Sequence, residues 1–209
     1  MTATSQPSLT VYSDYVCPFC YLGRQALAQY LETRDDPLTV DWHPFDLRSE
    51  KRGPDGDIDH SVDDGKDDDY YEQARQNVRR LQEKYDVEMV QEIATDVDSL
   101  PAQIASVYVD ETYPDRWRAF DEAVFDALWV DGRDVGDIDV LADLASDVGL
   151  DGDELRAAVD DADRRDRVFA RFREAREFGI TGVPTFVYGD HAARGAVPPE
   201  QLASLVEGV

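Results

Sequence analysis

The sequence predicts an α/β fold in which a helical domain is inserted between the second and third core strands. A β-prone run, a helix and a second strand follow one another before residue 48. The period of helices then dominates as far as residue 177, and strand-like alternation returns before a last helix. We therefore divide the chain into 1–62 and 179–209, the first and second parts of the core domain, and 63–178, the inserted helical domain.

The first part of the core begins with a short apolar, β-prone strand over residues 9–12. A helix over 18–33 follows, because Pro18 suits the first helical turn, where its missing N–H does no harm. A second strand over 38–44 starts with alternating apolar and polar residues. Residues 48–69 are rich in Gly and Asp and nearly free of apolar side chains, which predicts an exposed loop.

The inserted domain is predicted to be helical, since its apolar residues recur at intervals of three and four. The segment 114–130 shows this most clearly, because its apolar stripe contains Trp117, Phe120 and Val124, which favours a core face over a ligand site. Ser99 is a candidate cap for the helix that starts at residue 100. The other predicted helices begin at residue 70 or span 100–111, 137–148, 151–159 and 163–177.

The second part of the core is predicted to be a hairpin followed by a helix. Strands over 183–188 and 191–196 flank a Gly-Asp turn, and two prolines open a helix over 200–207. Together with the first part, this gives a four-stranded sheet.

The composition is strongly acidic. The chain has 209 residues, of which 46 are acidic and 21 basic, so its formal net charge is -25. This charge makes nucleic acid and anionic membranes unfavourable partners. No run of 18 apolar residues predicts a membrane span, and the first eight residues lack the basic start and apolar core of a signal peptide. We therefore expect a cytoplasmic protein.

The distribution of charge is typical of proteins from extreme halophiles. Aspartate runs recur, and only three of the basic residues, Lys51, Lys66 and Lys84, are lysines. Repulsion within such a chain destabilises the compact state in dilute buffer. In molar salt the Debye length falls to about 3 Å, which screens the repulsion. We expect stability to rise with salt concentration.

The candidate catalytic residues are Cys17 and Cys20, which stand where the first strand gives way to the first helix. The N-terminus of a helix carries unpaired N–H groups and a partial positive charge. Cys17 is therefore expected to ionise readily and act as a nucleophile. Cys20, less than one helical turn away, is placed to attack a disulfide that Cys17 forms with a substrate.

Two other roles for this cysteine pair are less favoured. As a structural disulfide it would close so small a loop that it stabilises the fold by only about 2 kcal/mol. As a zinc site it lacks a third cysteine, and the three histidines, among them His43, do not have the close Cys/His spacing of a tetrahedral site. We predict no metal and no cofactor other than a redox-active Cys17–Cys20 disulfide.

Two segments together resemble the DsbA-like family of thiol-disulfide oxidoreductases, and in particular its FrnE-like branch. They are 13–23, which reads SDYVCPFCYLG, and 179–186, which reads GITGVPTF. The resemblance implies a thioredoxin-like fold interrupted by the helical insertion. It also implies that Pro184 is a cis proline, which brings the Val183 backbone next to Cys17 to pair with an extended substrate.

The resemblance implies thiol-disulfide exchange with protein or small thiol substrates that contain a disulfide or a dithiol. Pro18 and Phe19, between the cysteines, join Val183 and Pro184 as predicted substrate-binding residues. A second copy of this chain is also a predicted partner, which would make the protein a homodimer. The alternative is a glutathione-dependent enzyme of the 2-hydroxychromene-2-carboxylate isomerase or kappa transferase type, which typically has Ser at the position of Cys17 and does not need a second thiol.

Overall fold

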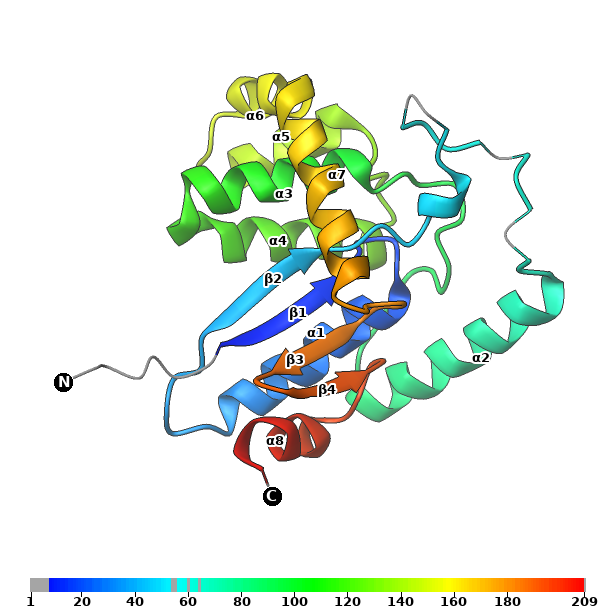
Figure 1. Cartoon of the computed structure of the whole chain (residues 1–209), viewed down its shortest axis with the longest axis vertical. Helices are drawn as coiled ribbons and strands as arrows, with labels where there is room; N and C mark the ends of the chain where they lie inside the picture. Colours follow the sequence, from blue (N-terminus) through cyan, green and yellow to red (C-terminus); the bar gives the residue numbers. More distant parts are fainter. Residues whose placement is uncertain (1–7, 54–55, 60, 64, 209) are drawn as a thin grey trace.

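The protein is built on one four-stranded sheet with the strand order β2-β1-β3-β4 (Figure 1). The computed structural model describes residues 8–53, 56–59, 61–63 and 65–208. Strand β1 (Leu9–Ser13) pairs in parallel with β2 (Val40–Pro44) and antiparallel with β3 (Thr185–Tyr188). Strand β4 (His191–Arg194) pairs antiparallel with β3 at the edge. The first and last parts of the chain thus meet at the centre of the sheet.

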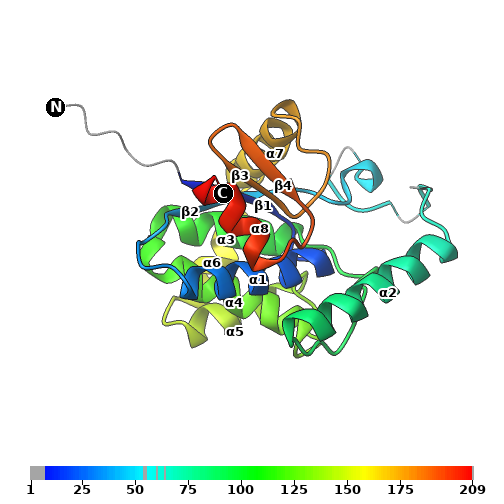
Figure 2. The ribbon, with the colours of Figure 1, turned by 90° about the horizontal axis from the view of Figure 1, so that it is seen from below.

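Helices cover both faces of this sheet (Figure 2). Helix α1 (Pro18–Glu32) connects β1 to β2 and packs with α8 (Pro199–Glu207) on one face. Helix α7 (Ala162–Glu177) packs against β2 on the other face and leads into β3. The first face buries Leu9, Leu27, Tyr30, Phe186 and Leu202, and the second buries Tyr12, Phe45, Ala175 and Ile180. Strands β1 and β3 at the centre of the sheet are therefore held between two layers of side chains.

The segment between β2 and β3 is helical, as the sequence predicts. It contains a 3-10 turn (Ser49–Lys51), α2 (Asp68–Tyr85) and then α3 to α7. Helix α2 extends away from the other inserted helices and contacts α1 (Figure 1). The remaining helices are α3 (Leu100–Thr112), α4 (Pro114–Trp129), α5 (Ile138–Asp147) and α6 (Gly152–Val159). No helix in the described ranges has both the length and the apolarity needed to cross a bilayer.

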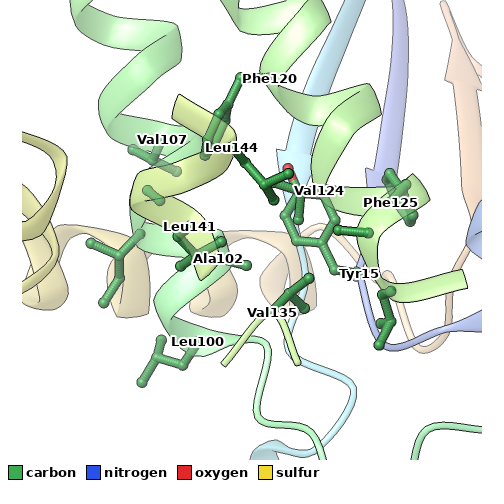
Figure 3. Close-up of a cluster of buried hydrophobic side chains, with 14 of the residues drawn as sticks. Tyr15, Leu100, Ala102, Val107, Phe120, Val124, Phe125, Val135, Leu141 and Leu144 are labelled. Atoms are coloured by element: carbon green, nitrogen blue, oxygen red, sulfur yellow. The ribbon is translucent and has the colours of Figure 1, made fainter. Parts of the chain in front are cut away.

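The inserted helices share a buried cluster with the loop that follows β1 (Figure 3). Tyr15 comes from that loop and points into the cluster, where its ring lies 4.7 Å from the ring of Phe125. Its backbone carbonyl accepts a hydrogen bond of 2.9 Å from Trp129 Nε1. Burial of each large apolar side chain stabilises the fold by about 1.5–3 kcal/mol. The cluster therefore fixes the loop that carries Cys17 to the insertion.

Two expectations about local structure are wrong. Ser99 does not cap α3, because its hydroxyl donates to Asp14 Oδ1 over 2.6 Å instead. The segment 48–69 is not simply an exposed loop, since it contains the 3-10 turn and an isolated bridge between Arg52 and Ile58. The predicted element boundaries lie within two residues of the observed ones.

Candidate active site

Cys17 is the residue from which α1 begins. It has extended backbone angles at the N-cap position, and Pro18 occupies the first helical position. The Cys17 carbonyl accepts hydrogen bonds from Cys20 N at 3.0 Å and Tyr21 N at 3.3 Å, which closes the first turn. Because the first N–H groups of a helix have no partners within it, the Cys17 side chain lies where negative charge is stabilised.

Cys17 lies at the base of a pocket of about 310 Å³, which we call the Cys17 pocket. Val16, Cys17, Pro18, Phe19 and Val183 form one side of it, and residues within 47–74 and 93–96 form the other. Only 2% of the Cys17 surface is exposed. A substrate therefore reaches this sulfur through the pocket.

The structure brings Val183 to Cys17 from the other end of the chain. The Cys17 thiol donates to the Val183 carbonyl, with Sγ and O 3.5 Å apart. The Val183–Pro184 peptide bond is cis. The Pro184 ring lies against α1 at Gly23, where an added Cβ would come within 3.1 Å of Pro184 Cγ. The absence of a side chain at Gly23 thus lets the helix of the two cysteines approach the Val183–Pro184 segment closely.

Cys20 faces a different space. Its side chain lines a small pocket of about 50 Å³, which we call the Cys20 cavity, together with Ser13, Trp42 and Asp121. Burial, and next the hydrogen bond and charge of Cys17, raise the pKa of the Cys20 thiol well above its usual value. Both cysteines are free thiols in this structure. Cys20 is therefore absent from the lining of the Cys17 pocket, and its raised pKa keeps the thiol protonated.

Asp121 forms a buried ion pair beside the Cys20 cavity. It is 1% exposed, and its carboxylate accepts hydrogen bonds from Arg24 and, at 2.9 Å, from Tyr15 Oη. Burial nevertheless raises the pKa of Asp121. Trp42 Nε1, which is also buried, has no hydrogen-bond partner. On this side of the helix, the ion pair therefore lies beside a small pocket that apolar side chains mostly line.

Asp14 and Tyr15, which precede the cysteine pair, hold the loop and do not line the Cys17 pocket. Asp14 is fully buried and accepts hydrogen bonds from Val16 N at 3.3 Å, Ser99 Oγ at 2.6 Å and Leu47 N at 2.8 Å. Burial, and next the charge of Asp46, raise the pKa of Asp14 to about 6. Asp14 therefore ties the loop before Cys17 to the segments after β2 and before α3.

Among the described residues, His43 does not line the Cys17 pocket or the Cys20 cavity. His43 is half-buried, its ring lies 4.8 Å from that of Tyr12, and burial lowers its pKa. In the part of the chain that the structure describes, no three His, Cys, Asp or Glu side chains come together as a metal-binding group.

Sequence reasoning missed the far wall of the Cys17 pocket. Arg48, Lys51, Lys66, Tyr70 and Tyr71 all line it. All five residues come from the segment predicted as a loop or from the start of α2, where no motif marks a site. The one available signal was their charge, since two of only three lysines in the chain lie here.

Comparison with known proteins decides the family. Residues 8–207 match the family described as DSBA-like thioredoxin domain. The chain belongs to this family. Its fold is accordingly the thioredoxin-like fold with a helical insertion, and members of this DsbA-like family are thiol-disulfide oxidoreductases.

Individual relatives agree with this assignment. The chain is 31% identical over 197 residues to the uncharacterized protein YwbO of Bacillus subtilis strain 168. The aligned region covers 90% of each protein. A probable DsbA oxidoreductase from Streptomyces coelicolor has a similar structure, with a TM-score of 0.76, 24% identity, and coverage of 97% of this chain and 91% of the other.

Two further structures resemble the DSBA-like chain at lower identity. A 2-hydroxychromene-2-carboxylate isomerase is 20% identical, has a TM-score of 0.76, and covers 96% of this chain and 93% of its own. The cytosolic disulfide reductase DsbM from Pseudomonas aeruginosa, solved with GSH, is also 20% identical, has a TM-score of 0.63 and covers the same shares. Identities this low show only a shared fold.

Proposed function

We propose that this protein catalyses thiol-disulfide exchange through Cys17 and Cys20. The observation that carries the proposal is the position of Cys17, which lies at the N-terminus of α1, opens onto a pocket and contacts the Val183 carbonyl. Cys17 as a thiolate attacks one sulfur of a substrate disulfide, and the other substrate sulfur leaves with the electron pair. Cys20 then loses its proton and attacks Cys17 Sγ, which releases the second substrate sulfur and leaves a Cys17–Cys20 disulfide.

The Val183–Pro184 segment acts as the platform on which the substrate is held. The Val183 carbonyl lies within reach of Cys17 Sγ, so an extended substrate bound there by its backbone would place its own sulfur beside the nucleophile. Pro18 and Phe19 form the adjoining side of the pocket and contact the groups next to that sulfur. The reaction uses no cofactor besides the Cys17–Cys20 disulfide, and its substrates are protein or small thiol compounds that contain a disulfide or a dithiol.

The second candidate is a glutathione-dependent isomerase or transferase. The size of the Cys17 pocket favours it, because a concave pocket of about 310 Å³ suits a small molecule. The buried second thiol favours the exchange reaction, since Cys20 has no task in an isomerase. Isomerase activity that survives in Cys20→Ser would support the second candidate.

The setting of the protein is also part of this proposal. The two core motifs support membership in the FrnE-like branch, and the net charge of -25 supports origin in an extreme halophile. The cytosolic reductase DsbM among the structural relatives supports a cytoplasmic location. Two such chains form the proposed homodimer. Sedimentation of the purified protein in molar KCl would test this oligomeric state.

Single-cysteine variants test the reaction. Cys17→Ser should abolish reduction of insulin disulfides by a small dithiol, because no other residue in the proposal attacks the substrate. Cys20→Ser should also lose turnover but should accumulate a mixed disulfide at Cys17, which intact-protein mass spectrometry detects. Circular dichroism of both variants provides the control for folding. Turnover by Cys17→Ser would refute the proposal.

A further inference from the structure

The described side chains that line the Cys17 pocket are richer in basic residues than the chain as a whole. The chain has 46 acidic and 21 basic residues. Among the described residues that line the pocket, however, three are basic, Arg48, Lys51 and Lys66, and Asp96 is the one that is acidic. Random placement in so acidic a chain would give the reverse. The excess of cations at the reactive thiol therefore calls for a functional explanation.

Separate structural features bring these cations to the pocket. Arg48 and Lys51 flank and end the 3-10 turn, and the Arg48 guanidinium donates to the Ala94 carbonyl across the pocket. Lys66 comes from the segment before α2 and is half-buried, whereas Gly65 and Asp67 beside it are exposed. Holding a long lysine side chain inward costs conformational entropy. Two loop segments therefore place charge over the same opening.

The remaining wall of the pocket suits a small ligand. Phe19 and Leu47 provide apolar surface near Cys17, and the rings of Tyr70 and Tyr71 meet edge to face with centroids 5.5 Å apart. A volume of about 310 Å³ falls at the lower end of the range of small-molecule sites. A short chain that ends in a charged group fits such a pocket more readily than a folded protein substrate does.

We propose that the substrates that enter the Cys17 pocket are low-molecular-weight thiols or disulfides that carry carboxylate groups. This inference rests on the thiol-disulfide exchange proposed above and specifies its substrate. Cys17 attacks a disulfide of this class, one carboxylate-bearing thiolate leaves with the electron pair, and the other is retained as a mixed disulfide until Cys20 displaces it. The two enzyme thiols are oxidised and the disulfide is reduced to two thiols.

Both the ligand and the leaving group in this step are anions. Arg48, Lys51 and Lys66 attract the carboxylates as the substrate binds. A charge at about 4 Å in water changes an equilibrium by about fivefold. Removing either lysine should therefore reduce reaction with an anionic disulfide by about fivefold and leave a neutral one nearly unchanged.

The test compares three dialkyl disulfides of the same chain length: dithiodipropionate, which is a dianion, hydroxyethyl disulfide, which is neutral, and cystamine, which is a dication. Each is mixed with reduced Cys20→Ser, and mass spectrometry follows formation of the mixed disulfide. Rates are divided by those of a free small thiol with the same reagents, which removes intrinsic reactivity. The expected order is dianion, neutral, dication, and molar salt should compress it.

Substitutions locate the effect. Lys51→Gln and Lys66→Gln, made in Cys20→Ser, should each lower the normalised rate with the dianion, and Lys66→Arg should retain it. Lys84→Gln is the matched control, because it removes the third lysine of the chain, whose ammonium lies over the Tyr85 ring on α2 and not in the pocket. Circular dichroism of each variant confirms folding.

The outcomes separate this inference from the reaction on which it rests. If Cys20→Ser forms a mixed disulfide with none of the three reagents, the exchange reaction and this inference both fail. If it reacts with all three at equal normalised rates, exchange stands and the preference for anions is overturned. An equal loss in Lys84→Gln would also overturn it, because the effect would then come from net charge and not from the pocket.

Discussion

The two sides of the first turn of α1 differ sharply. On one side Cys17 opens onto a pocket of about 310 Å³ with basic and aromatic walls. On the other side Cys20 faces a cavity of about 50 Å³ beside the buried Asp121 and the unpartnered Trp42 Nε1. The two residues are three apart in sequence, yet one lies toward substrate and the other toward the core.

In the proposed reaction, this difference assigns different tasks to the two thiols. The helix N-terminus lies close to both, so it cannot by itself distinguish them. Their surroundings do, because Cys17 lines the larger pocket, whereas Cys20 lines the small Cys20 cavity, where burial raises the pKa of its thiol. In the proposed reaction, Cys20 therefore reacts with a sulfur already bonded to Cys17. The order of the two steps thus follows from where the first turn sits between pocket and core.

The largest expected effect concerns the core side. Arg24→Met removes the cationic partner of Asp121, which is 1% exposed, and leaves a buried carboxylate with Tyr15 Oη as its remaining donor. Breaking a buried ion pair in this way costs about 3–5 kcal/mol. Urea unfolding should show this loss of stability, while the folded fraction should still form a mixed disulfide at Cys17.

An exposed arginine provides the control for this change. Arg118, on α4, is exposed, so Arg118→Met should alter the free energy of unfolding by less than about 0.5 kcal/mol. Equal stability of the Arg24 and Arg118 variants would show that the core side is not held by its ion pair. The comparison between the two sides would then lose its structural basis.

A smaller effect should appear in the pH dependence of stability through Asp14. Its pKa is raised from 3.8 in the unfolded chain to about 6 in the folded one, so the folded state binds the proton more tightly. Stability from this group therefore falls as pH rises from about 4 to about 6 and then levels off, a change of about 3 kcal/mol. Asp14→Asn should flatten this part of the urea-unfolding profile.

The Asp14→Asn variant should also be less stable at every pH. Three donors bond to the two carboxylate oxygens of Asp14, whereas the amide of asparagine has only one acceptor oxygen. Glu83→Gln, an exposed residue of α2, should leave the pH slope as it is. A slope shared by all three proteins would assign the titration to other carboxyl groups.

The smallest expected effect is that of salt, which should act on the stability of the whole chain and on the Cys17 pocket in opposite ways. Molar KCl should raise the melting temperature, because it screens repulsion in a chain of net charge -25. A gain of about 1 kcal/mol corresponds to about 2–4 °C for a chain of this size. The same salt should weaken the preference of the Cys17 pocket for anions. A melting temperature that stays constant would contradict the halophilic origin.

Much of the fold was predictable because local signals agree with it. Pro18 starts α1, the apolar period marks each inserted helix, and the alternation over 183–188 marks β3. Ser99 was misassigned because a serine before a helix is a good cap in isolation. Its actual partner, Asp14, is 85 residues away in sequence, and no local pattern indicates such a contact.

The candidate site was predictable only on one side. The two cysteines and the Val183–Pro184 segment form motifs, so their residues could be named in advance. The opposite wall comes from loop and helix segments whose side chains converge only after α2 folds back beside α1. Because those side chains share no period and no spacing, the sequence showed their charge but not their location.

The contact between Cys17 and Val183 has a consequence for synthesis of the protein. The two residues are 166 positions apart, so a ribosome exposes both sulfurs long before it makes the carbonyl that faces the first of them. Until β3 pairs with β1, the two thiols of the nascent chain lack the contact with Val183, and an oxidant could join them in a disulfide. Selectivity is therefore acquired late, with the final strands, and a stalled or truncated chain would have the chemistry without the discrimination.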